Sequence, residues 1–130
     1  EFFRENPSKI HTWLVSIRGI SDTLAGKILS CVDFSRTKSV ASLWRYAGLA
    51  PEDVKRKGKK ASWNHQLKFY CYQVSDEFVK QRTPRYREIY ETEKKKQADR
   101  ELTKGHVDMR ARRKVAKVFL RDLFYEAGGV

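Results

Sequence analysis

Two clusters of lysine and arginine are the residues of this sequence best suited to chemistry, because acidic residues do not balance them. The first cluster surrounds Gly58 and adds +5 to the net charge within six positions. It consists of Lys55, Arg56, Lys57, Lys59 and Lys60. The second cluster, Lys104–Arg121, has seven basic residues and one acid, Asp108, and adds +6. Such segments favour a surface for nucleic-acid phosphates over a merely solubilising surface.

The second cluster has the spacing of one helix face. Its cations recur at i, i+3, i+4, i+7 and i+11: Arg110, Arg113, Lys114, Lys117 and Arg121. Apolar residues that include Val115 and Phe119 lie on the opposite face of the same helix. We therefore expect Arg110, Arg113, Lys114 and Lys117 to contact phosphates, together with the five cations around Gly58. Charge reversal at Arg113 and Lys117 should then weaken binding without unfolding the protein.

A third candidate for phosphate binding is the tight turn Gly19-Ile20-Ser21. Residues 10–31 have the form of a helix-hairpin-helix, in which amides at the start of the second helix can hold a backbone phosphate. Ser21 stands where that motif has a second glycine. The alternative is a helical hairpin that only packs in the core, and the sequence leaves both interpretations open.

Four aromatic residues follow the basic loop and could stack on unpaired bases. They are Trp63, Phe69, Tyr70 and Tyr72. Tyr70 lies on the apolar stripe of its helix, and such aromatics are more often part of a core. We expect Trp63 to be the exposed one.

Enzymatic groups are sparse. His11, His65 and His106 are scattered, with no spacing typical of a metal site. Ser62 follows the basic loop, where cations could lower the pKa of an attacking hydroxyl, although a serine just before Asn64 is more commonly a helix cap. We therefore expect no metal site, and Ser62 is the one weak catalytic candidate.

Composition and cysteine use set the class and compartment. The 130 residues are 40% apolar and 34% charged, with a net charge of +12, which excludes a collagen, a membrane span and a wholly disordered chain. Cys31 and Cys71 are far apart among apolar neighbours, so we expect two buried free thiols in the reducing cytoplasm. We also expect no signal peptide and no membrane-spanning stretch. Because the chain begins at Glu1, we expect it to be part of a longer protein.

Helical spacing of apolar residues runs through almost the whole chain and predicts a single all-α domain over residues 1–130. The first helix should follow Pro7, and Ser21 should cap the second. A third should run from near Thr37 to Gly48, and the basic loop should cover 51–62. The remainder, 64–126, should hold three helices: one capped by Asn64, one with Thr83 as cap and Pro84 at its first position, and one over His106–Glu126.

The order of several motifs resembles a known domain. The motifs are Ile17-Arg-Gly-Ile20, Leu43-Trp-Arg-Tyr-Ala-Gly-Leu-Ala-Pro51, the basic loop with Asn64-x-x-Leu67-Lys68, Pro84–Tyr90 and Gly105–Leu120. This set is similar to the C-terminal domain of the insertion sequence 110/116/902 transposase family, the relatives of the Piv DNA invertase. The resemblance covers roughly residues 14–123, and its most specific part is Tyr46–Pro51.

The resemblance implies a mobile-element recombinase that contacts DNA and, in several members, a structured guide RNA. Members join this domain to an N-terminal RuvC-like domain that binds divalent metal, so the resemblance implies no cofactor in this fragment. We also expect the full-length protein to be a homo-oligomer. The family's serine nucleophile lies in a Ser-Gly pair shortly after the Gly-Leu-x-Pro motif. Here Lys57-Gly58 occupies that place, so we do not expect this fragment to cut DNA.

Two alternatives to a nucleic-acid-binding domain remain at the level of sequence. One is a catalytic serine recombinase domain that uses Ser62. The other is a helical dimerisation module in which the positive charge is incidental.

Overall fold

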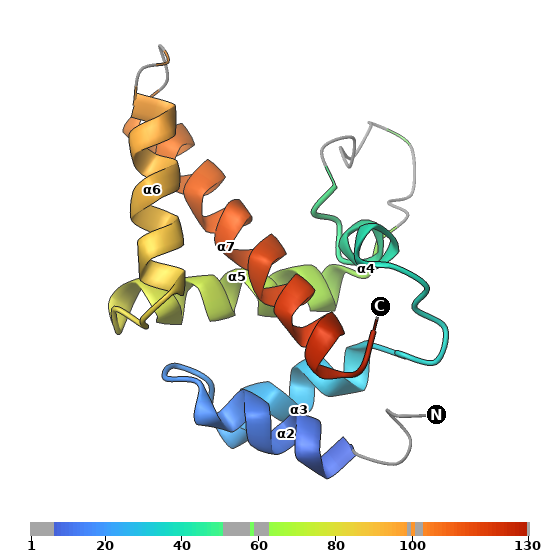
Figure 1. Ribbon diagram of the computed structural model, residues 1–130. Coiled ribbons are helices and arrows are strands. Elements are labelled where there is room, and N and C mark those ends of the chain that lie inside the picture. Colours follow the sequence, from blue (N-terminus) through green and yellow to red (C-terminus); the bar gives the residue numbers. More distant parts are fainter. Residues whose placement is uncertain (1–6, 51–57, 59–62, 99, 101–102, 130) are drawn as a thin grey trace.

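The computed structural model describes residues 7–50, 58, 63–98, 100 and 103–129, and in this part of the chain all regular structure is helical (Figure 1). The helices are α2 (Pro7–Ser16), α3 (Asp22–Cys31), α4 (Val40–Tyr46), α5 (His65–Lys80), α6 (Tyr86–Ala98) and α7 (Lys104–Glu126). The predicted all-α class is confirmed. None of the described helices is long and apolar enough to cross a membrane.

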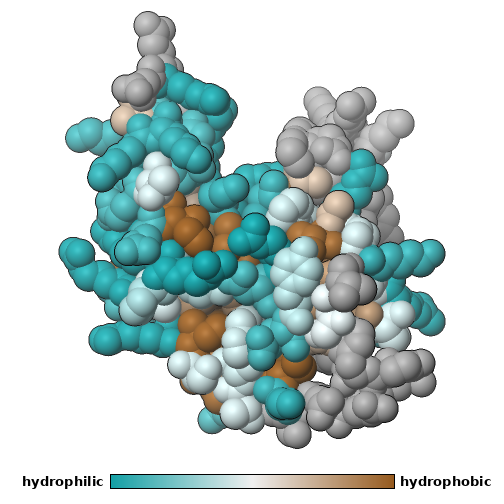
Figure 2. All heavy atoms as spheres, in the orientation of Figure 1, coloured by the Kyte–Doolittle hydropathy of each residue, from teal (hydrophilic) through white to brown (hydrophobic). Residues whose placement is uncertain are grey.

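Helix α7 is the longest element and organises the others. It packs against α2, α4, α5 and α6, and α6 lies antiparallel beside it (Figure 1). The paired ends of α6 and α7 stand out from the body as an arm, which is covered mainly by hydrophilic side chains (Figure 2).

Side-chain caps define the starts of four helices. Ser21, Ser39, Asn64 and Thr103 each accept a hydrogen bond from a backbone amide three residues further on. These bonds satisfy amides that have no partner inside the helix. The predicted caps Ser21 and Asn64 are confirmed, whereas α4 and α7 begin at Val40 and Lys104 rather than near Thr37 and His106.

The predicted start of the fifth described helix is wrong. α6 begins at Tyr86 and has no capping bond from the Thr83 side chain, whose hydroxyl donates a 2.7 Å hydrogen bond to the carbonyl of Arg18. Thr83 is buried, so this bond joins the turn after α2 to the turn before α6. Arg82 and Arg85 in the same turn adopt positive φ angles of 52° and 73°, which helices exclude.

One apolar core joins the described helices. Its centre is aromatic: the rings of Phe78 and Tyr86 stack with centroids 4.3 Å apart, and Phe119 meets Phe78 edge-on at 5.8 Å. Leu14 and Ile28 bring α2 and α3 into this core, and both are fully buried. Because α5, α6 and α7 meet at these three rings, the position of α7 relative to the body is fixed by packing rather than by surface contacts.

Candidate nucleic-acid interface

The exposed cations of α7 form a narrow strip along the helix. Arg110, Lys114 and Arg121 are all exposed, while Val115 and Phe119 on the other side of the helix are fully buried. In the described part of the chain none of these three cations forms an ion pair; Arg110 makes only a long 3.4 Å contact with the amide oxygen of Gln97. Their charge is therefore available to an external anion.

Arg113 and Lys117 lie at one edge of the strip and contact the protein itself. The Arg113 guanidinium donates a 2.6 Å hydrogen bond to the carbonyl of Ala50. The ammonium group of Lys117 lies 4.3 Å from the centre of the Trp44 ring, and the Trp44 indole N–H donates to the Lys117 carbonyl at 2.9 Å. Both side chains therefore help to hold α4 and Ala50 against α7. Reversing the charges of Arg113 and Lys117 would disturb this packing. The contacts therefore argue against the prediction that this double substitution leaves the protein folded.

The first basic cluster and the serine candidate lie outside the described residues. These residues are Lys55, Arg56, Lys57, Lys59, Lys60 and Ser62. The flanks of this segment are described, and both are fixed beside α4. Ala50 accepts the hydrogen bond from Arg113, and Asn64 donates its backbone amide to the Tyr46 carbonyl at 2.7 Å and its side-chain amide to the Tyr46 hydroxyl at 2.9 Å. The chain thus leaves and re-enters the described structure next to the cation strip.

Gly48 and Trp63 pack against each other between these flanks. Gly48 has a φ of +73°, and a Cβ placed on it would lie 2.6 Å from Cγ of the Trp63 ring. Only glycine fits this position without strain, because other residues rarely adopt this φ and the ring leaves no room for a side chain. The most specific part of the resemblance, Tyr46–Pro51, therefore contains a residue with a clear packing role.

The aromatic residue that is most exposed is not the predicted one. Trp63 is half-buried, with its ring against Gly48 and the ammonium group of Lys68 at 4.6 Å from the ring centre. Phe69 is 64% exposed, and Tyr70 and Tyr72 are half-buried. The expectation of an exposed Trp63 is thus wrong, since the ring packs against Gly48, fifteen residues earlier in the chain.

The turn Gly19-Ile20-Ser21 packs against α5. Ile20 is buried, and the Ser21 hydroxyl already accepts the Leu24 amide at 3.2 Å. A Cβ on Gly19, whose φ is +107°, would lie 3.3 Å from Cβ of Glu77. Glu77 also lines the hollow beside the turn, and its carboxylate would repel a phosphate placed there. This geometry favours the core-packing interpretation of the hairpin.

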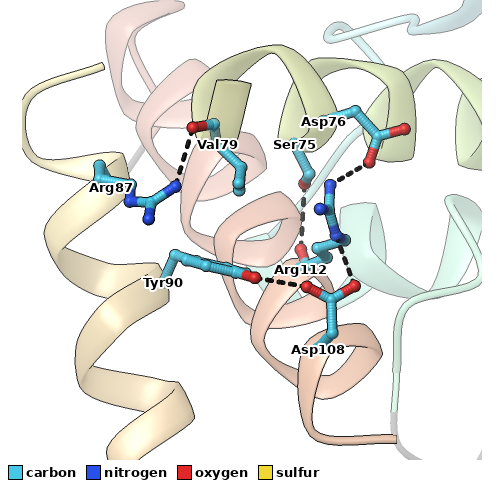
Figure 3. Close-up of polar contacts among 7 residues, drawn as sticks. All are labelled: Ser75, Asp76, Val79, Arg87, Tyr90, Asp108 and Arg112. Atoms are coloured by element: carbon cyan, nitrogen blue, oxygen red, sulfur yellow. Dashed lines mark hydrogen bonds and ion pairs between the residues drawn. The ribbon is translucent and has the colours of Figure 1, made fainter. Parts of the chain in front are cut away.

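A cluster of charged residues between α5, α6 and α7 was missed by the sequence analysis (Figure 3). The Arg112 guanidinium donates to Asp108 at 2.8 Å and also to Asp76, and the Tyr90 hydroxyl donates to Asp108. The Ser75 hydroxyl donates to the Arg112 carbonyl at 3.0 Å. The signal that could have identified this cluster is the spacing of Asp108 and Arg112, which is i, i+4 and lies off the cation strip.

The electrostatics of this cluster are those of a structural ion pair. Burial alone would raise the pKa of Asp108, but the hydrogen bonds from Tyr90 and Arg112 outweigh it, so the pKa lies below its ordinary value. Burial, followed by the hydrogen bond to Asp108, raises the pKa of Tyr90. The hydrogen bonds thus favour the ionised form of the Asp108 carboxyl and the neutral form of the Tyr90 hydroxyl. Such a cluster is suited to joining three helices and not to proton transfer at neutral pH.

Neither the two cysteines nor the comparisons with known proteins identify a further site. Cys71 is buried as predicted and burial raises its pKa, whereas Cys31 is only half-buried. The described residues contain no group of three or more His, Cys, Asp or Glu side chains placed to hold a metal ion.

Compared with protein families, curated proteins and solved structures, the chain matches none. The cation strip of α7 is therefore the main indication of function.

Proposed function

We propose that this chain is a nucleic-acid-binding domain of an insertion-sequence transposase, and that it contacts DNA or a structured guide RNA through the cation strip of α7. The observation that supports this most is the exposure of Arg110, Lys114 and Arg121 on a helix whose other side is buried. The motifs described above for the insertion sequence 110/116/902 family supply the transposase part of the proposal.

The dimensions of the strip suit a phosphate backbone. Arg110 and Arg121 are eleven residues apart, which is roughly 16 Å along a helix at 1.5 Å per residue. This length corresponds to about five base-pair steps along the axis of a duplex, at 3.4 Å each. Since the core holds α7 in place, these cations can meet the phosphates without ordering a flexible segment first, which lowers the entropic cost of binding.

A salt series tests the proposal. The affinity of the domain for labelled duplex DNA and for a structured RNA would be measured by fluorescence anisotropy at increasing salt. The wild type is compared with a variant that carries Arg110→Gln, Lys114→Gln and Arg121→Gln. Log affinity falls with log salt, and each duplex phosphate that the variant no longer neutralises should make this slope less steep by about 0.9. Three such phosphates should make it less steep by about 2.7.

A matched control separates the strip from the total charge. Lys9, Lys38 and Lys80 are exposed cations outside α7's strip, and their replacement by glutamine also lowers the net charge from +12 to +9. We expect this control to keep most of the salt slope of the wild type. Equal losses in both variants would contradict the assignment of the strip, and salt-insensitive binding by the wild type would contradict nucleic-acid binding as a whole.

A further inference from the structure

The outward face of α5 carries an unusually exposed aromatic side chain. Phe69 is 64% exposed, more than the other large exposed apolar residues described, which are Tyr125 at 53%, Met109 at 51% and Tyr46 at 43%. Leu67 and Cys71, two residues before and after it, are fully buried. At about 100° per residue, residues two apart lie on roughly opposite sides of a helix, so Phe69 points away from the core. Its ring makes no contribution to the core that would explain its presence.

One aromatic ring contacts Phe69, and a cation covers that ring. The Tyr70 ring meets it edge-on with centroids 5.9 Å apart, and the ammonium group of Lys27, from α3, lies 5.8 Å from the Tyr70 ring centre. Lys68, the residue before Phe69 in the chain, lies with its ammonium group 4.6 Å from the centre of the Trp63 ring. The cation over the Tyr70 ring favours an anion on this side of α5.

The polar side chains of α5 beside Phe69 include two amides, and Glu77, the first carboxylate on this side of the helix, lies about two turns beyond Phe69. Gln66 and Gln73, one turn before and one turn after Phe69, are both exposed. α5 carries no carboxylate before Asp76, and Asp76 forms an ion pair with Arg112. An amide can both donate to and accept from the edge of a nucleobase, whereas a carboxylate would repel the backbone.

From this arrangement we infer that Phe69 is a stacking platform for an unpaired base of a single-stranded or looped nucleic acid. The base lies on the ring, Lys27 attracts a flanking phosphate, and Gln66 and Gln73 reach the base edge. A second copy of this chain is the less suitable occupant, because it carries the same net charge of +12. The inference rests on the proposed function and adds a second contact surface, on the side of α5 that faces away from the core.

The test compares two probes of one sequence. The affinity of wild type and Phe69→Ala is measured by anisotropy for a labelled single-stranded oligonucleotide and for the same oligonucleotide in a duplex, at one low salt concentration. We expect Phe69→Ala to reduce the affinity for the single strand by about 5- to 150-fold, the range that one stacked base accounts for, and the affinity for the duplex by less than about twofold.

Two further variants control the experiment. Tyr125→Ala removes an aromatic side chain of similar exposure from the end of α7 and should change neither affinity. Phe69→Trp keeps a stacking surface and should keep the single-strand affinity. Because Phe69 is outside the core, the melting temperature of Phe69→Ala should equal that of the wild type.

Each other outcome overturns the inference. An unchanged single-strand affinity of Phe69→Ala, or equal losses of affinity for both probes, would exclude base stacking on Phe69. Duplex binding by the wild type would still support the proposed function in that case. A dimer in sedimentation experiments that Phe69→Ala dissociates, without a single-strand effect, would assign the face to a second copy. If the wild type binds neither probe, the proposed function and the inference fail together.

Discussion

The contact between Gly48 and Trp63 gives the sharpest test of the structure. In Gly48→Ala the new Cβ would lie 2.6, 2.8 and 2.9 Å from three atoms of the Trp63 ring, well inside contact distance. Holding alanine at a φ of +73° costs about 1–2 kcal/mol, and the overlap with the Trp63 ring adds about 1–3 kcal/mol. We therefore expect Gly48→Ala to lower the free energy of unfolding by about 2–5 kcal/mol.

A double-mutant cycle separates the two causes. In a Trp63→Ala background the ring is gone, so Gly48→Ala should cost only the backbone strain, about 1–2 kcal/mol. The coupling between the two positions should thus be about 1–3 kcal/mol. Urea unfolding of the four proteins, followed by far-UV circular dichroism because Trp63 contributes to the fluorescence, gives each free energy of unfolding.

Additive costs would refute this reasoning. If the two substitutions combine within about 0.5 kcal/mol, Trp63 does not pack on Gly48. The chain would then re-enter the fold at a different place, and the position of Asn64 beside α4 and the cation strip would no longer be supported.

Two further predictions concern titratable groups. Cys71 is buried and burial raises its pKa, so Ellman's reagent should react with Cys31 alone in the native protein and with both thiols after unfolding in guanidinium. Rapid reaction of both thiols in the native protein would contradict the packing of α5. The pKa of Asp108 is lower in the folded state, so its stabilising contribution should be complete above about pH 4 and should disappear as the pH falls through the folded-state pKa. Asp108→Asn should lower the urea midpoint at pH 7 and flatten the acid loss of stability, and an unchanged acid profile would argue against the Asp108–Arg112 pair.

Local patterns in the sequence were enough to predict most of the fold. Ser21 and Asn64 cap helices as predicted, because capping depends on residues within three positions along the chain. Thr83 fails as a predicted cap for the opposite reason. Its hydroxyl bonds to the Arg18 carbonyl, 65 residues away in the sequence, and no local pattern indicates such a partner.

The same limit applies to the candidate interface. Helical periodicity correctly groups the cations of α7 on one face, but it cannot reveal that Arg113 contacts Ala50 and Lys117 contacts Trp44. Trp63 precedes its helix, so periodicity gives no information on its exposure. Phe69 did carry a signal, since it falls off the apolar stripe of α5, and a strict application of the helical period would have predicted its exposure.

The like charges one turn apart on α7 destabilise the helix in the isolated protein, so the function of the protein must account for them. Arg110 and Lys114, and likewise Lys117 and Arg121, are like charges at i, i+4, and each such pair destabilises a helix by about 0.2–0.5 kcal/mol. Helix α6 has the opposite arrangement, because Arg87 and Glu91 form a 2.6 Å ion pair at the same spacing. A surface that served only solubility could use the paired arrangement of α6 throughout. A bound polyanion would supply the negative charge that the strip lacks, and this difference between two adjacent helices favours a nucleic-acid partner for α7 over an incidental excess of charge.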